Sequence, residues 1–130
     1  MLFRSRCPWG IFILDHMGYP QLDAGPAAFQ PILDLAKRDN VYLKLSAVAG
    51  ASKQGFPHED VHPYIKLLQQ AFGARRMVWG TGYPGQHRVK HQWPTLPDEL
   101  RLVREGLPFL SAAEQDRILG GTAAEIWNLG

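Results

Sequence analysis

The sequence predicts an α/β fold built on a parallel sheet, and three observations lead to this prediction. Short apolar runs rich in β-branched and aromatic residues recur along the chain, as in strands that are buried on both faces. Between them lie stretches whose apolar residues recur at helical spacing. The sequence also has 13 glycines and 10 prolines among its 130 residues, which favours many short connections over long helices. Strands that alternate with helices in this way are typical of parallel sheets.

The first predicted unit begins with a strand at Ile11–Leu14, which leads into a loop rich in glycine and proline over residues 15–25. A helix follows, with Pro26 near its first turn and Asn40 as its stop. The apolar face of this helix consists of Phe29, Ile32, Leu33 and Ala36.

The second predicted unit has a strand at Val41–Leu45, a loop at Ser46–Pro57 and a helix that ends at Gly73. The third has a strand at Arg76–Trp79 and a loop at Gly80–Pro94. Apolar residues again mark the two helices at helical spacing. They are Ile65, Leu68 and Phe72 in the second unit, and Leu96, Leu100, Val103 and Leu107 in the third.

Three segments resemble capping boxes, in which a hydroxyl and a carboxylate satisfy the first backbone N–H groups of a helix. They are Thr95–Asp98, Ser111–Glu114 and Thr122–Glu125. Gly120–Gly121 stands between the last two. We therefore expect the chain to end in two short helices.

Ligands of parallel α/β proteins bind where loops leave the carboxyl ends of the strands. Here those positions are Asp15–His16, Ser46 and Thr81–Gly82. The three loops that follow them are also the longest and most irregular of the chain. The sequence thus predicts the place of a site before any motif is considered.

Composition excludes several classes of protein. The chain is long enough for one domain, residues 1–130, and 45% of its residues are hydrophobic, enough to form a core. Its one cysteine, Cys7, excludes an internal disulfide framework and a cysteine-rich zinc module. A net charge of +2 without a basic block gives no sign of nucleic-acid binding. No apolar stretch approaches the roughly 18–20 residues that cross a membrane, so we expect a cytoplasmic protein.

Two segments match the residue pattern of a known motif but lack the structural context that the motif requires. Residues 58–62 fit H-E-x-x-H of zinc proteases, but Pro57 and Pro63 flank them, whereas that chemistry needs one continuous helix. We interpret the segment as a polar loop in which His62 leads into a helix. Residues 80–85 fit G-x-G-x-x-G, yet no apolar periodicity follows before Leu96, so a loop is the better interpretation there too.

Asp15 and His16 carry the strongest chemical signal, because they directly follow a buried strand. A neutral imidazole there serves as metal ligand, general base or carbonyl polariser. The alternative is a loop histidine bonded to the backbone, and spacing alone leaves both open.

The segment Asp15-His16-Met17-Gly18-Tyr19-Pro20 resembles the D-H-x-G-x-P segment of amidohydrolase-related hydrolases, the superfamily branch that contains sugar lactonases and pyrone-dicarboxylate lactonase. Three more segments agree in order and spacing, so that the resemblance covers the chain from about Ile11 to Leu129. They are Asn40–Ser46, Phe72–Gly80 and Ile118–Ala124.

The resemblance implies the carboxy-terminal part of a (β/α)₈ TIM barrel, about three β/α units plus terminal helices. Such a barrel takes about 250 residues, so a homo-oligomer or an amino-terminal half-barrel would complete the sheet. The resemblance also implies that His16 binds a metal or polarises the substrate carbonyl, with Asp15 in support. A divalent metal such as zinc is one alternative, and catalysis without a metal is the other. The family's strand-one His-x-His pair has no counterpart in this chain.

After its last strand the family has W-G-[ST]-D-W-P, and the aspartate there is the general base. This chain has Trp79-Gly80-Thr81-Gly82-Tyr83-Pro84, so that glycine stands at the base position and cannot accept a proton. Thr81 is a weaker catalytic candidate beside it.

His87, Arg88 and His91 are weaker candidates for substrate binding, because helical spacing would put both histidines on one face. The alternative there is a solvated basic loop. Lys44 and Lys53 are either surface charges or, inside a barrel strand, groups that face the site. Trp79 and Trp93 are expected to pack rather than to bind a ligand.

Two functions therefore follow. One is a hydrolase that adds water to a lactone- or amide-type carbonyl in a small carboxylated or sugar-derived substrate. The other is a non-catalytic protein, as a pseudoenzyme, a half-barrel subunit or a truncated gene product.

Overall fold

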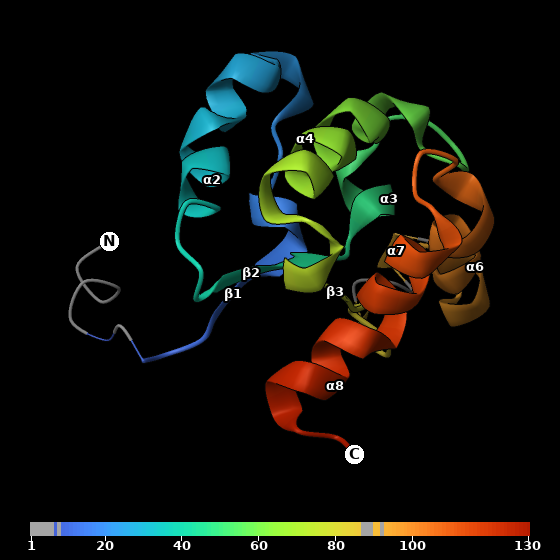
Figure 1. Cartoon of the computed structure of the whole chain (residues 1–130). Helices are drawn as coiled ribbons and strands as arrows, with labels where there is room; N and C mark the ends of the chain where they lie inside the picture. Colours follow the sequence, from blue (N-terminus) through green and yellow to red (C-terminus); the bar gives the residue numbers. More distant parts are fainter. Residues whose placement is uncertain (1–6, 8, 87–89, 92) are drawn as a thin grey trace.

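The computed structural model describes residues 7, 9–86, 90, 91 and 93–130. Its centre is a parallel sheet of strand order β1-β2-β3, made by β1 (Phe12–Leu14), β2 (Val41–Leu45) and β3 (Met77–Trp79) (Figure 1). The predicted parallel α/β fold is confirmed. The first and third strands are each one residue shorter at their start than predicted.

Helices connect the strands and follow the last of them. Figure 1 shows α2 and α4 on the same side of the strands, with α8 near the carboxyl terminus. The α-helices are α2 (Gln30–Leu35), α3 (Val48–Ala51), α4 (His62–Phe72), α6 (Leu96–Arg101), α7 (Ala112–Asp116) and α8 (Thr122–Trp127). Short 3₁₀ turns lie at Asp15–Gly18, Leu22–Ala24, Pro26–Phe29, Glu59–Val61 and Ala74–Arg76, and π-helical segments at Leu102–Gly106 and Arg117–Gly121.

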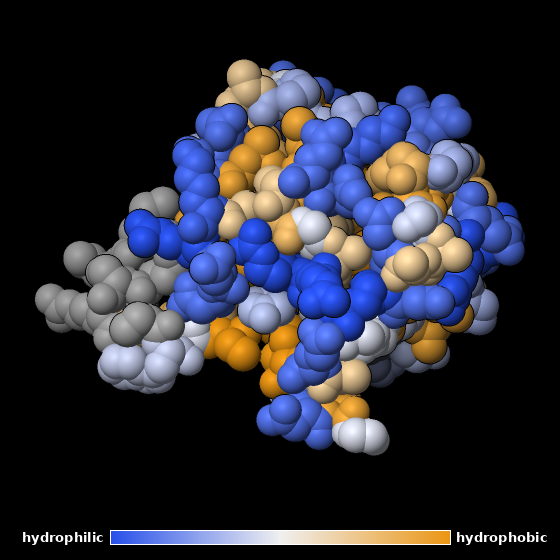
Figure 2. Space-filling view, viewed as in Figure 1, coloured by the Kyte–Doolittle hydropathy of each residue, from blue (hydrophilic) through white to orange (hydrophobic). Residues whose placement is uncertain are grey.

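Side chains of β2 alternate between the core and a more open face, because successive residues of a strand point to opposite sides. Val41, Leu43 and Leu45 are at most 1% exposed and belong to the main core, together with the apolar face of α4. Tyr42 and Lys44 are only half-buried. In the space-filling view, hydrophilic side chains cover much of α2 and α4, and apolar atoms show between them and below, near the strands (Figure 2).

The Arg76 guanidinium joins the ends of two helices. It donates hydrogen bonds to the carbonyl oxygens of Ala36 and Arg38, both at 2.8 Å, and to that of Phe72 at 3.2 Å. Ala36 follows the last residue of α2, and Phe72 is the last residue of α4. Carbonyls at helix ends lack partners within the helix, so Arg76 satisfies groups that would otherwise need water.

Two of the three predicted capping boxes are present, and the third is wrong. Thr95 caps α6 and Ser111 caps α7. Thr122 is instead completely buried, and its hydroxyl donates to the carbonyl oxygen of Ala74 at 2.8 Å. The backbone stays helical through Gly121, so the two glycines do not separate two helices as expected; the π-helical segment joins α7 to α8.

The sheet has open edges within the described residues, since β1 and β3 each pair only with β2. Among the same residues no helix is both long and apolar enough to span a membrane.

Replacing Arg76 with methionine is expected to lower the free energy of unfolding by about 2–4 kcal/mol, because hydrogen bonds from a charged donor are lost and helix-end carbonyls are left without partners. Urea unfolding of the purified protein measures the change. Arg75→Met is the control, because Arg75 is the adjacent, exposed arginine. Equal stability losses in both variants would contradict the role of Arg76.

Candidate active site

His16 lies in a left-handed turn that directly follows β1. Positive φ angles run through four consecutive residues, from 51° at His16 through 57° and 70° to 57° at Tyr19. Left-handed backbone costs a non-glycine residue roughly 1–2 kcal/mol, so surrounding contacts must hold this turn. Met17 is completely buried, and a Cβ built on Gly18 would lie 2.9 Å from Cδ1 of Ile32. The turn therefore presents His16 in one fixed place.

The imidazole of His16 bonds to Ser46, the residue that follows β2. The distance from Nδ1 to Oγ of Ser46 is 2.9 Å, and Ser46 is only 3% exposed. The Tyr19 ring and the imidazole pack in a T-shaped arrangement, with ring centroids 5.2 Å apart. A hydroxyl both donates and accepts, so Ser46 supports either tautomer of His16. Nε2 can thus act as a hydrogen-bond donor in one tautomer and as a base in the other.

Asp15 and Lys44 form an ion pair next to this histidine. Lys44 lies on the open face of β2. Its aliphatic stem packs against Gly80, because a Cβ added at Gly80 would lie only 2.8 Å from Cδ of Lys44. The hydrogen bond from Lys44 is the main cause that lowers the pKa of Asp15. Asp15 therefore stays a carboxylate whose charge the ammonium of Lys44 offsets. Lys53 lies elsewhere, in an exposed pair with Asp23.

Thr81 and Gly82 lie beyond the end of β3. The hydroxyl of Thr81 accepts a hydrogen bond from the backbone N–H of Tyr83 at 3.2 Å, as in a local turn. A Cβ built on Gly82 would meet no atom within 4 Å. Position 82 thus has room for a side chain, and its glycine is not required by packing.

The weaker candidates are only partly described. His91 is exposed, and its ring centroid lies 6.3 Å from that of Trp93. His87 and Arg88 lie outside the described residues, so the proposed pairing of His87 with His91 stays a prediction. Trp93 packs against Gly50, where a Cβ would be 2.8 Å from the indole, and Trp79 packs against the core, as expected for both.

His58 and His62 do not form a protease-type site. Nδ1 of His58 donates to the Gln54 carbonyl and Nε2 of His62 to the Pro57 carbonyl, each at 2.9 Å. His58 lies outside the helix that starts at His62, so the two rings do not share one helical face. His62 is the first residue of α4 rather than its lead-in. The glycine-rich segment at 80–85 is followed directly by helical residues, since Gln86 and Lys90 are both in helical conformation, so the prediction that no helix begins before about Leu96 is wrong.

The described residues include no group of three histidine, cysteine or acidic side chains placed to hold a metal ion. His16 has a serine on one side, and the nearby Asp15 is paired with Lys44. These residues alone do not fit a zinc site, which takes at least three protein ligands.

The sequence placed His16 at the end of the first strand, and the structure adds Ser46 as the hydrogen-bond partner of its imidazole. Ser46 could be recognised only as the residue after a buried strand.

Comparison with known protein families assigns the chain to one of them: the sequence model of the Amidohydrolase family matches residues 5–129. The chain belongs to the amidohydrolase family.

Two curated relatives act on lactones by name. The chain is 34% identical over 122 residues to the 4-sulfomuconolactone hydrolase of Rhizobium radiobacter, covering 90% of this chain and 39% of that protein. It is 31% identical over 96 residues to the L-fucono-1,5-lactonase of Burkholderia ambifaria, covering 70% of this chain and 32% of that protein. The chain thus spans less than half the length of these amidohydrolase relatives.

A solved amidohydrolase structure from Burkholderia multivorans, with bound zinc, matches the fold with a TM-score of 0.77 and 26% identity. The match covers 98% of this chain and 47% of that one. The expected fold class is confirmed: the three strands and their helices correspond to part of an amidohydrolase TIM barrel.

Replacing Lys44 with methionine is expected to raise the pKa of Asp15 toward its ordinary value, because the main hydrogen bond that lowers it is lost. A carboxyl group whose pKa is lowered in the folded state stabilises the fold at pH values above its ordinary pKa. That contribution is lost as the pH falls through the folded-state pKa. The Asp15 carboxyl ¹³C shift, followed against pH, measures the change.

Lys37→Met is the matched control, because it breaks the ion pair of Lys37 with Asp34 and leaves Asp15 untouched. An Asp15 titration curve identical in wild type and Lys44→Met would contradict the assignment.

Proposed function

We propose that this chain supplies part of the active site of a lactone hydrolase, with His16 as its catalytic residue. The observation that carries this proposal is the hydrogen bond between His16 and Ser46 at the carboxyl ends of neighbouring parallel strands. The lactone-acting relatives support the reaction class. The proposed substrate is a small carboxylated or sugar-derived lactone.

In the proposed step His16 polarises the lactone carbonyl. When the Ser46 hydroxyl donates to Nδ1, the proton of His16 lies on Nε2 and can bond the carbonyl oxygen. That bond strengthens as negative charge develops on the oxygen during water attack. The rigid left-handed turn keeps the donor in position before the substrate arrives.

The attacking water also needs a base, and Gly82 cannot serve as one. In the proposed hydrolase a less well-placed base elsewhere in the intact protein therefore takes this proton, and the reaction is slower than with an aspartate at position 82. This same glycine favours the second candidate, a non-catalytic protein of the same fold.

A complete barrel requires a partner for the open sheet. We propose a second half-barrel, from the same polypeptide or from another copy of the chain. Among the described residues the outer edges of β1 and β3 pair with no further strand, which supports this proposal. Trp9 and Ile11, which precede β1, are 80% and 50% exposed and support it too.

Replacing His16 with alanine in the intact protein is expected to lower kcat by about 10²–10⁴-fold on its best substrate in a panel of small sugar lactones and carboxylated lactones. Proton release during ring opening measures the rate. His62→Ala is the control, since it removes another half-buried histidine with one ring hydrogen bond. Unchanged lactone hydrolysis in His16→Ala would refute the assignment, and a wild type inactive on the whole panel would favour the non-catalytic protein.

Replacing Gly82 with aspartate is expected to raise kcat/KM for lactones by about 10²-fold or more, because it restores a general base at a position with room for it. The same proton-release assay measures the gain, and thermal unfolding checks that the fold is kept. If a folded Gly82→Asp protein shows no gain, then glycine at 82 does not limit the reaction.

A further inference from the structure

The open face of the sheet carries polar groups beside His16 that the proposed hydrolysis step does not use. Successive residues of a strand point to opposite sides, so Lys44 lies on the face opposite Leu43, which belongs to the core. The register pairs Leu14 with Leu43, and Asp15, the next residue, therefore lies beside Lys44. The ion pair between the two side chains is thus at the carboxyl end of the sheet.

Packing holds the Lys44 ammonium in place. A Cβ added at Gly80 would lie 3.2 Å from Cγ of Lys44 and 2.8 Å from its Cδ, so the stem occupies the space that the glycine leaves free. The Lys44 side chain is only 26% exposed. A donor held in this way loses little conformational entropy when a ligand binds to it.

The ion pair leaves hydrogen-bonding capacity on both of its partners. An ammonium has three N–H donors, and a carboxylate has about four acceptor positions. Within the described part of the chain, the Asp15 and Lys44 side chains bond to each other and to no other group. The hydrogen bond from Lys44 is the main cause that lowers the pKa of Asp15, and attraction to Lys44 and His16 lowers it further. The pair therefore presents charged donors and acceptors side by side, with no net charge.

Tyr19 adds an aromatic surface beside the same histidine. Because its ring and the imidazole of His16 pack in a T-shaped arrangement, the imidazole covers at most one face of the tyrosine ring. Tyr19 is 64% exposed. The left-handed turn fixes it, since the Tyr19 N–H donates to the His16 carbonyl oxygen at 2.9 Å. The exposed ring offers a surface on which the apolar face of a ligand ring can pack.

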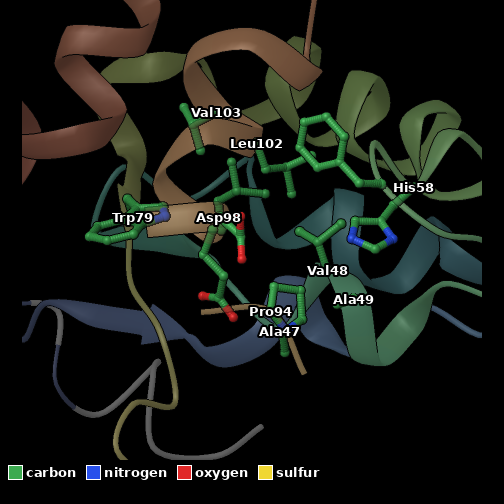
Figure 3. A pocket seen from close by; sticks show the side chains of 12 residues that line it. Ala47, Val48, Ala49, His58, Trp79, Pro94, Asp98, Leu102 and Val103 are labelled. Carbon is green, nitrogen blue, oxygen red and sulfur yellow. The ribbon is translucent and has the colours of Figure 1, made fainter. Parts of the chain in front are cut away.

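The pocket on the other side of the sheet end offers no comparable space. It lies between the segment after β2 and α6, with Val48, Trp79 and Asp98 in its wall (Figure 3). Its volume is about 20 Å³, room for one or two water molecules. Neither His16 nor Lys44 lines it. A substrate that bonds to His16 must therefore lie on the open face.

We propose that Asp15, Lys44 and Tyr19 form a subsite for a sugar ring, so that the substrate is a neutral, polyhydroxylated lactone. This inference rests on the proposed function for the reaction and adds the class of substrate. One hydroxyl of a vicinal diol accepts from the Lys44 ammonium, and its neighbour donates to the Asp15 carboxylate, because a hydroxyl can do both. The C–H groups of the sugar ring pack on Tyr19.

The charges of the subsite favour this substrate over a carboxylated lactone. A carboxylate on the substrate would meet the like charge of Asp15, and it could bond to Lys44 only by breaking the existing ion pair. An apolar ring would displace water from the donors of Lys44 and the acceptors of Asp15 without replacing its hydrogen bonds. Neutral hydroxyls satisfy both groups and leave the ion pair intact.

Three lactams that share a six-membered ring test the subsite without turnover. Gluconolactam carries hydroxyls, oxopipecolate carries a carboxylate, and valerolactam carries neither. In calorimetric titrations of the intact protein, gluconolactam is expected to bind at least about tenfold more tightly than the other two. It is also expected to shift the carboxyl ¹³C signal of Asp15. Equal or tighter binding of either analogue would overturn the proposal, as would gluconolactam binding that leaves the Asp15 signal unmoved.

Two variants test the residues. Lys44→Met keeps the aliphatic stem and is expected to weaken gluconolactam binding about fivefold or more, and Tyr19→Leu about threefold or more. The matched controls are Lys53→Met, which breaks an exposed pair with Asp23, and Tyr19→Phe, which keeps the ring. Tyr19→Leu changes an exposed residue and decides the question if Lys44→Met does not fold. Unchanged affinity in Tyr19→Leu, or equal losses in Lys44→Met and Lys53→Met, would overturn the subsite.

Turnover separates this proposal from the proposed function. A protein that prefers gluconolactam and hydrolyses no lactone would keep the sugar subsite and overturn the hydrolase. A protein that hydrolyses lactones and binds valerolactam or oxopipecolate at least as well as gluconolactam would keep the hydrolase and overturn the subsite.

Discussion

The alternation of side chains along the central strand is the constraint on which the rest of the structure depends. Val41, Leu43 and Leu45 must all enter the core, because each is almost completely removed from water. A shift of one residue in register would place Lys44 in that core, at the cost of burying its charge. The same requirement that forms the core therefore brings Lys44 to the face where Asp15 lies.

The end of this strand separates two chemical environments. On one side Ser46 meets His16, beside a charge pair that is internally balanced. On the other side Leu45 and Val48 line an apolar pocket with an acidic wall. The two environments meet at the end of β2, because Leu45 and Ser46 are consecutive residues.

Local patterns predicted most of the fold and part of the candidate site. Apolar periodicity located the strands and helices, because burial of one face determines where those residues occur. It located His16 because ligands meet the carboxyl ends of parallel strands. It could not predict Ser46 as the partner, since that contact joins residues 30 positions apart and depends on how two loops bend. Thr122 shows the opposite error: its local pattern is that of a cap, yet a distant carbonyl binds its hydroxyl.

The Arg76 hydrogen bonds have a consequence for the order of folding. The carbonyl groups of Ala36 and Arg38 lie 40 and 38 residues before it, so these bonds close long loops and carry a large entropic cost before they form. Contacts of this kind require β2 and the neighbouring helices to be in place first. We therefore expect the Arg76 hydrogen bonds to form after the folding transition state. Such bonds slow unfolding far more than they speed folding.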